Sequence, residues 1–214
     1  EKSYEKAIPY LRKALITQPN NFLATKYLGF ALHRLRKYNE AMTPLKKVMN
    51  LRPDDKEVLF TMGECFYESG SDDKSLKLLS RLRADPVFGP QASLYTGLIR
   101  AKTNQPEKAV EDFQIGLKHS SIPLEISNEL KYRLAQTFIK MQNIGQAVKL
   151  LKEILSVSPG YKDASTLIKR YQELNQNKNL QTYLMAGQSE FVGLCRKIVA
   201  RFYPKAKVKI LDIT

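Results

Sequence analysis

The stretch LGFALHRLRKYNEAMTPLKKVMNLRP occupies residues 28–53, and its pattern returns along the chain at a step of 34 residues. A glycine stands second in this stretch, and a small residue and a large apolar residue follow it at fixed distances. The three sets are Gly29, Gly63 and Gly97; Ala7, Ala41, Ser75 and Ala109; and Leu11, Leu45, Leu79 and Phe113. Three kinds of residue that keep one period over several units indicate a repeat protein.

A period of this length suits a unit of two antiparallel helices, here called helix A and helix B. Glycine removes a side chain where helix A meets helix B, and the small residue does the same from helix B. A proline then ends helix B, because proline lacks an amide hydrogen and does not fit a helix interior. These prolines are Pro19, Pro53, Pro86 and Pro159.

With this pattern the chain resembles the tetratricopeptide-repeat (TPR) family over residues 1–175. The resemblance implies an all-α fold, a right-handed superhelical solenoid of antiparallel helix pairs. From Ala109 to Ala147 the step is 38 residues, so four residues are inserted near 118–127 and should lengthen the next helix A by about one turn. We expect a half repeat at 1–21, repeats at 22–55, 56–89, 90–127 and 128–161, and a capping helix at 162–175.

The composition is that of a globular chain with an excess of positive charge. Apolar residues make up 43% and charged residues 26%, and the net charge is +14. No apolar stretch reaches the roughly 20 residues of a membrane span. The charge could attract acidic proteins or nucleic acid. However, the basic residues form no long run, which favours a solvated surface over a nucleic-acid interface.

The sequence contains no recognisable catalytic or metal-binding motif. Cys65 and Cys195 lack the spacing of metal ligands, and His33 and His119 lack a zinc-binding context. No nucleophile motif and no phosphate-binding glycine loop stands out. We therefore expect no enzymatic activity, no cofactor and no metal site. We expect Cys65 in the core and both histidines at the surface.

The TPR resemblance also implies a concave groove lined by helices A, with a bound segment contacted from the same places of each repeat. Aromatic rings at such places offer large contact area at low entropic cost, although some could instead complete the core between repeats. We expect a protein or peptide ligand, extended or helical, with apolar anchors. Transferred place by place, the expected groove residues are Lys26, Tyr27, Phe30, His33, Arg34, Phe60, Glu64, Tyr67, Tyr95, Leu98, Tyr132 and Arg133.

One TPR class holds the C-terminal carboxylate of chaperone tails with lysine and asparagine residues from successive helices A. Lys26 matches the first lysine of that pattern. Phe30 and Thr61 stand where the family has asparagine, and Gln91 and Tyr95 stand in the third helix A. The clamp is incomplete, so we do not expect chaperone tails as partners.

The sequence changes character after the repeats. Residues 176–187 are a candidate linker, and residues 188–214 predict an amphipathic helix followed by a strand at 207–213. This segment resembles the start of an Mrr-type restriction-endonuclease-like domain, whose catalytic places are not in this chain. The alternative is an extra amphipathic helix that packs on the solenoid. A lone strand leaves its backbone groups unpaired, so we also expect self-association through residues 205–214.

The expected function is a protein-interaction scaffold that binds a partner peptide or helix as part of a larger assembly. A TPR array before such a tail is similar to some bacterial multi-domain TPR proteins, including spirochaete proteins of the periplasmic flagellar collar, which implies a cell-envelope or flagellar assembly. The alternative is a recruitment module of a nucleic-acid-linked protein with a nuclease-like C-terminal domain. We expect the chain to begin inside a repeat, with its N-terminus truncated, so a cytoplasmic and a periplasmic location both stay open.

Overall fold

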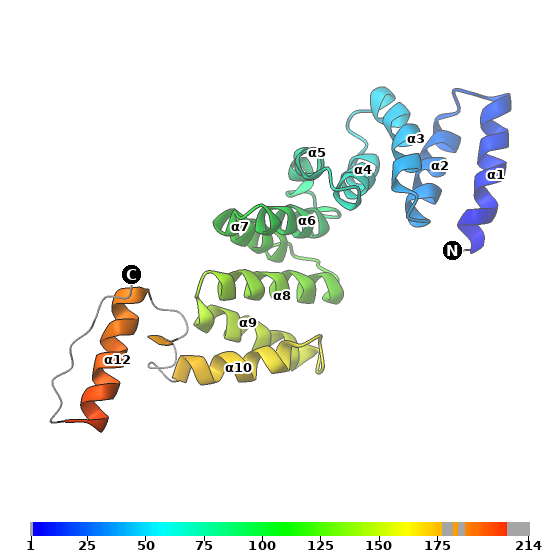
Figure 1. Ribbon diagram of the computed structural model, residues 1–214. Helices are drawn as coiled ribbons and strands as arrows, with labels where there is room; N and C mark the ends of the chain where they lie inside the picture. Colours follow the sequence, from blue (N-terminus) through cyan, green and yellow to red (C-terminus); the bar gives the residue numbers. More distant parts are fainter. Residues whose placement is uncertain (1, 177–181, 184–186, 205–214) are drawn as a thin grey trace. The chain divides into compact units, whose positions relative to one another are not determined.

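The computed structural model describes residues 2–176, 182–183 and 187–204, and every regular element in these ranges is helical (Figure 1). The expected all-α fold is therefore confirmed for the described residues. The predicted strand at 207–213 and most of the expected linker at 176–187 lie outside them. The chain divides into two compact units, Glu1–Thr137 and Phe138–Thr214.

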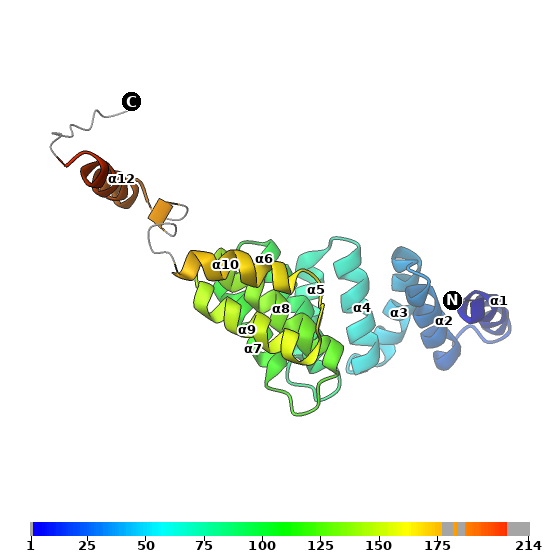
Figure 2. The same ribbon diagram turned by 90° about the horizontal axis from the view of Figure 1, so that it is seen from below.

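In the first unit helices B and helices A alternate along the chain. Each helix A contacts its helix B, and each helix B contacts the next helix A, from α1 through α7 (Figure 2). Helices A of neighbouring repeats also touch, α2 with α4 and α4 with α6. The bounds are α1 Lys2–Thr17, α2 Phe22–Arg34, α3 Tyr38–Leu51, α4 Lys56–Glu68, α5 Asp72–Leu79 with the 3-10 helix η1 Ser80–Leu82, α6 Gly89–Lys102 and α7 Pro106–Leu117.

The next helix A, α8, runs from Leu124 to Lys140 and crosses the boundary between the units. It has 17 residues, against 13 in α2 and in α4, so the four inserted residues do lengthen this helix. The second unit continues with α9 (Ile144–Val157) and α10 (Ala164–Gln176), which contact each other, and with α12 (Gln188–Phe202). α12 confirms the amphipathic helix expected in the tail, and its Leu194 is buried.

The turn from helix A to helix B is the same in all four repeats. One residue in each turn has a positive φ, between 57° and 74°: Arg36, Gly70, Asn104 and Gln142. These residues follow one another at steps of 34, 34 and 38, the steps of the sequence repeat. Only Gly70 is a glycine, so the other three turns hold a side chain in a left-handed conformation, which costs about 1–2 kcal/mol per residue.

Side-chain caps fix the start of two helices A. The Asn21 side chain accepts a hydrogen bond of 2.9 Å from the amide of Ala24, and Asp55 accepts one of 3.2 Å from the amide of Val58. Each cap satisfies an amide that has no partner inside the helix, which stabilises a helix by about 1 kcal/mol. Asn21 and Asp55 therefore fix where α2 and α4 begin.

Closest packing within each pair occurs at the repeated glycine. A Cβ atom placed on Gly29 or Gly63 would lie 2.5–2.6 Å from Leu45 or Leu79, and one placed on Gly97 would lie 2.4 Å from Phe113. Each of these large partners comes sixteen residues after its glycine and is fully buried. Helix A and helix B can approach this closely only because the glycine has no side chain.

The small residue on helix B adds a second contact to the same crossing. Ala41 and Ala109 are completely buried there, and Ser75 takes the equivalent place in the second repeat. The Ser75 hydroxyl donates a hydrogen bond of 2.8 Å to the carbonyl of Gly63, so its polar atom is satisfied in the core. A serine is therefore tolerated where the repeat otherwise has alanine.

We predict that Gly63→Leu strongly destabilises the protein. The new side chain must enter space that Leu79 fills, and overpacking of this kind costs about 1–3 kcal/mol or more. Gly145→Leu is the matched control, because a Cβ on Gly145 meets nothing within 4 Å. Thermal unfolding followed by circular dichroism should show a lower Tm for the first variant only. Equal melting of the two variants would contradict the packing described here.

Candidate functional site

The expected groove residues lie on α2, α4, α6 and α8, the helices A of the four repeats. We call the side of these helices that carries them the A face. All twelve residues belong to the first unit. Their contacts divide into a charged group at the start of α2, a polar seam across three helices, an aromatic cluster and a separate pair on α8.

Lys26 links the first two helices A. Its ammonium group lies 2.8 Å from the Asp55 carboxylate and 2.9 Å from that of Glu57, and it also lies 5.4 Å from the centre of the Phe30 ring. Burial alone would lower the pKa of Lys26, but the hydrogen bonds to both carboxylates outweigh it and raise the pKa. This lysine already forms ion pairs with two carboxylates, so it links neighbouring repeats and is not free to bind an anionic ligand.

Three side chains form a polar seam across α2, α4 and α6. The Tyr95 hydroxyl donates a hydrogen bond of 2.9 Å to one oxygen of Glu64. The other oxygen of Glu64 lies 3.4 Å from Nε2 of His33. The sequence placed all three at the groove, and the structure brings them together as one chain of contacts. We call His33, Glu64 and Tyr95 the seam.

Burial sets the charge states of the seam. It raises the pKa of Glu64, although the hydrogen bond from Tyr95 opposes this shift. It also lowers the pKa of His33, helped by the nearby charge of Arg34, so the imidazole is neutral at neutral pH. Burial and the Glu64 carboxylate raise the pKa of Tyr95, which keeps its hydroxyl protonated and able to donate. The seam therefore carries at most one negative charge, shielded between two neutral rings.

An aromatic cluster lies beside the seam. The Phe60 ring centre is 5.2 Å from that of Phe88 and 6.2 Å from that of Tyr95, while Tyr67 lies 5.0 Å from Tyr95 in an edge-on arrangement. Phe60 is buried, so this ring completes the core between repeats instead of facing solvent. Phe88 belongs to the same cluster but precedes its helix, where the family's groove places gave no reason to select it.

On α8 the two expected residues form a separate pair. Tyr132 is buried, and the Arg133 guanidinium lies 5.8 Å from its ring centre. Arg133 also donates to Glu129 at 2.8 Å and to Gln136 at 3.2 Å. Tyr132 is thus a core residue of its repeat, and Arg133 is anchored on its own helix.

The A face nevertheless presents side chains that can meet a partner. Tyr27 is 55% exposed and Leu23, one turn earlier on α2, is 58% exposed. Arg34 is exposed as well, while Phe30, Tyr67 and Leu98 are half-buried. Tyr27 packs edge-on against Phe30 at 6.4 Å, which fixes the orientation of the exposed ring. The available surface is therefore mainly apolar and aromatic and lies on a rigid base.

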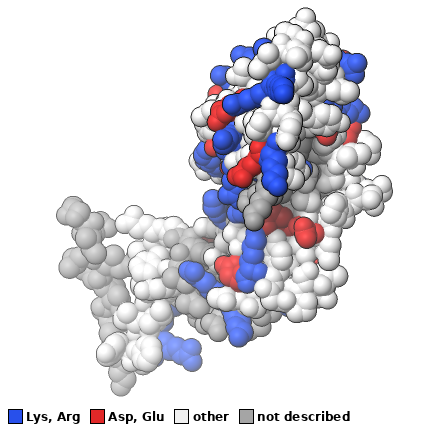
Figure 3. Space-filling model, turned by 90° about the vertical axis from the view of Figure 1, so that its right-hand side faces the viewer, with Lys and Arg blue, Asp and Glu red and all other residues white. Residues whose placement is uncertain are grey.

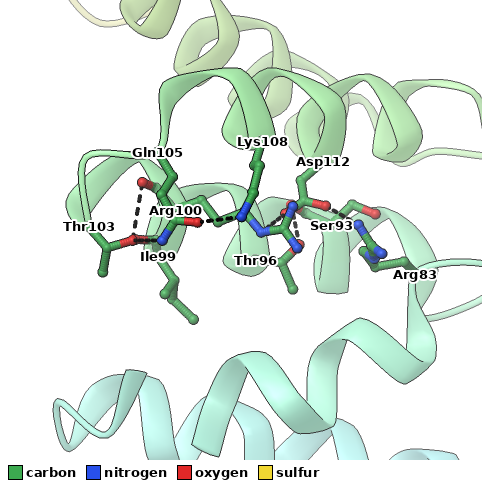
Figure 4. Close-up of polar contacts among 9 residues, drawn as sticks. All are labelled: Arg83, Ser93, Thr96, Ile99, Arg100, Thr103, Gln105, Lys108 and Asp112. Atoms are coloured by element: carbon green, nitrogen blue, oxygen red, sulfur yellow. Dashed lines mark hydrogen bonds and ion pairs between the residues drawn. The ribbon is translucent and has the colours of Figure 1, made fainter. Parts of the chain in front are cut away.

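A buried charge cluster, which sequence reasoning missed, joins the second and third repeats (Figure 4). Asp112 on α7 is completely buried, and its carboxylate is paired with Arg83, which follows η1. The second carboxylate oxygen lies 3.2 Å from Nε of Arg100 on α6. Because Asp112 lacks contact with water, both arginines are needed to compensate its charge.

The repeat register itself contained the signal for this cluster. Where the third repeat has Arg100, the other three have Leu32, Phe66 and Phe138. Where it has Asp112, they have Pro44, Leu78 and Leu150. Opposite charges at two places that are otherwise apolar indicate that the two side chains pair with each other, as the structure confirms.

The histidines depart from expectation. Both were expected at the surface, yet His33 belongs to the seam and His119 is also partly buried. Nε2 of His119 lies 2.9 Å from the carbonyl oxygen of Arg83, and its ring occupies the space that a Cβ on Gly89 would need. Among the described residues, no group of three or more His, Cys, Asp or Glu side chains is arranged to hold a metal ion.

The described surface carries mixed charge. Figure 3 shows one side of the molecule, where Lys and Arg side chains are more prominent than Asp and Glu but lie among them. This distribution agrees with a net charge of +14 spread along the chain. Within the described ranges, no helix is both long and apolar enough to cross a membrane.

A model of the tetratricopeptide repeat matches residues 129–161, which cover most of α8 and all of α9. The same period runs through the preceding helix pairs, whose helices cross at Gly29, Gly63 and Gly97. The chain thus contains a tetratricopeptide repeat. No curated protein sequence matches the chain.

Solved structures with the TPR fold resemble the chain at low sequence identity. PilF of Pseudomonas aeruginosa is 16% identical, with a TM-score of 0.68 over 96% of this chain and 86% of PilF. MamA of Desulfovibrio magneticus RS-1 is 20% identical, with a TM-score of 0.64 over 80% of this chain and 88% of the MamA chain. YrrB, described as a TPR protein with an unusual peptide-binding site, is 13% identical, with a TM-score of 0.63 over 91% of this chain and 93% of the YrrB chain. At such identities the likeness establishes the fold alone.

We predict that Asp112→Leu destabilises this TPR array by about 3 kcal/mol, because two guanidinium groups lose their shared counter-charge. Arg100→Phe combined with Asp112→Leu restores the apolar residues of the other repeats and should recover at least about 1 kcal/mol of that loss. Urea unfolding of the two single variants and the double variant measures this coupling. Strictly additive effects would mean that the pair does not stabilise the crossing.

We also predict that the two cysteines differ in reactivity. Cys65 is completely buried, and burial raises the pKa of its thiol to about 12, whereas Cys195 is only partly buried. Because the thiolate is the reactive form, iodoacetamide at neutral pH should modify Cys195 alone in the folded protein. Mass spectrometry should find Cys65 modified only after denaturation, and its rapid labelling in the native state would contradict its placement in the core.

Proposed function

We propose that this protein is a protein-interaction scaffold whose A face binds a partner peptide or helix through apolar anchors. The observation that carries the proposal is the exposed pair Leu23 and Tyr27, held next to the half-buried Phe30 on a rigid helix. Tyrosine is enriched among the hot spots of protein interfaces, and an exposed leucine beside it adds apolar area that a partner can bury. A TPR array displays such a base without needing a cofactor.

The polar contacts of the A face favour apolar recognition over charge recognition. Lys26 is already paired with Asp55 and Glu57, and Glu64 already receives the hydrogen bond from Tyr95. A ligand would have to break these contacts to use the same groups. Because they are also links between repeats, they keep the surface preorganised, which reduces the entropy lost on binding.

One structural neighbour supports this proposal. YrrB is described as having a peptide-binding site, and it shares the fold with this chain. A role in a bacterial cell-envelope or flagellar assembly stays a prediction. The alternative of a nucleic-acid-linked protein rests on the tail, where residues 205–214 lie outside the described part of the chain, and it too stays a prediction, as does self-association through that segment.

We predict that Leu23→Ala combined with Tyr27→Ala abolishes most of the peptide binding. Peptides are first selected on the wild-type protein from a displayed random library, and their Kd is measured by calorimetry. Loss of two anchors should weaken binding at least tenfold, since each contributes about 1–2 kcal/mol. Affinity should change little with salt concentration, because few exposed charges take part.

The matched control removes one leucine and one tyrosine elsewhere. Leu51 on α3 and Tyr10 on α1 are exposed to similar or greater degrees, so Leu51→Ala with Tyr10→Ala makes the same chemical change away from the A face. The control should keep the wild-type Kd. If it loses affinity and the A-face variant does not, the A face is not the binding site.

A further inference from the structure

A groove lies among the helices of the first two repeats, away from the A face. A groove of about 580 Å³ runs between α3 and α5, the helices B, and is floored by α4. Its apolar residues are Met49, Met62, Phe66 and Leu78. Its remaining lining residues are Lys46, Asn50, Pro53, Lys74, Lys77 and Arg81. We call it the B groove; it shares no residue with the A face.

The floor of the B groove leaves apolar surface uncovered. Met62 is almost fully buried, but Met49, Phe66 and Leu78 are only partly buried and form the accessible base. Methionine adapts its shape to different partners and is common on surfaces that bind peptides. Because burial of apolar area is favourable, this base suits an apolar occupant.

The rim of the B groove carries charge of one sign. Lys46 stands on the α3 side and Lys77 on the α5 side, and neither has a carboxylate within ion-pair distance among the described residues. Lys74 lies 5.7 Å from the Phe66 ring centre, and Arg81 is paired with the exposed Asp54 at 3.0 Å. No acidic residue lines the groove. An occupant with carboxylates on both flanks would therefore match it.

The openness of the groove distinguishes between possible occupants. A volume of this size would suit a small ligand, but small-ligand sites bury about 70–90% of their ligand. Here six lining residues are exposed, including all four cations, so one side of any occupant stays in water. An amphipathic helix meets these conditions, because its apolar stripe can lie on the floor while its polar side faces solvent.

We propose that the B groove is a docking site for an acidic amphipathic helix, separate from the proposed peptide site on the A face. Apolar residues at i, i+3, i+4 and i+7 of the helix contact Met49, Phe66 and Leu78. Glutamate or aspartate residues on its two flanks pair with Lys46 on one side and with Lys77 on the other. The first two repeats then bind one partner on the A face and another in the B groove.

A synthetic peptide tests this site directly. A fluorescein-labelled peptide of about 18 residues carries leucine at the four spacings and glutamate at the flanking places. Fluorescence anisotropy should detect binding to the wild-type protein. Lys46→Glu with Lys77→Glu should weaken it at least about tenfold, because attraction becomes repulsion on both flanks. Circular dichroism of each free variant checks that it is folded.

Three controls separate this site from simpler explanations. Lys13→Glu with Lys47→Glu makes the same charge change at exposed residues outside the groove, and should leave the affinity within about twofold. Leu23→Ala with Tyr27→Ala, which alters the A face, should also leave it unchanged. A peptide of the same composition with scrambled leucine spacing should bind about tenfold more weakly. The proposal is overturned if the wild type does not bind, if both charge variants bind alike, if the scrambled peptide binds equally, or if the A-face variant loses the peptide.

Discussion

The close crossing of helix A and helix B at the repeated glycine is the constraint on which the other contacts depend. Gly29, Gly63 and Gly97 let a leucine or phenylalanine of helix B fill the space against the backbone of helix A. This sets the distance between the helices of a pair. Only then can the next helix A reach back to the previous one, so that the seam and the Lys26 contacts can form.

The same constraint explains how much of the fold could be predicted. The small residue at the helix crossing recurs at the repeat spacing, as glycine in three repeats and as Ala135 in the fourth, and it therefore appears in the sequence as a period. The insertion of four residues, which lengthens α8, was readable for the same reason, because it shifts the small residue of helix A, the alanine of helix B and the turn together. The left-handed turns could not be predicted from the sequence. A glycine would have marked each of them, but three of the turns have Arg36, Asn104 and Gln142 instead.

The candidate site was harder to predict, because a place within a repeat does not settle what a side chain touches. Phe60 and Tyr132 occupy family groove places but are buried, and Phe88 and Arg133 lie close to their rings. Lys26 and Glu64 look like free charges in the sequence, and only the three-dimensional structure pairs them. Arg100 and Asp112 could have been paired by comparing the repeats with one another, place by place.

The links between repeats also span short distances along the chain. Lys26–Asp55, Arg83–Asp112 and Tyr95–Glu64 join residues 29 to 31 positions apart. Closing loops of about one repeat costs little entropy, and chains dominated by local contacts fold quickly. Folding can then nucleate at any helix pair and spread to its neighbours. A segment of this array that emerges from the ribosome can therefore acquire its native contacts before the rest of the chain has been made.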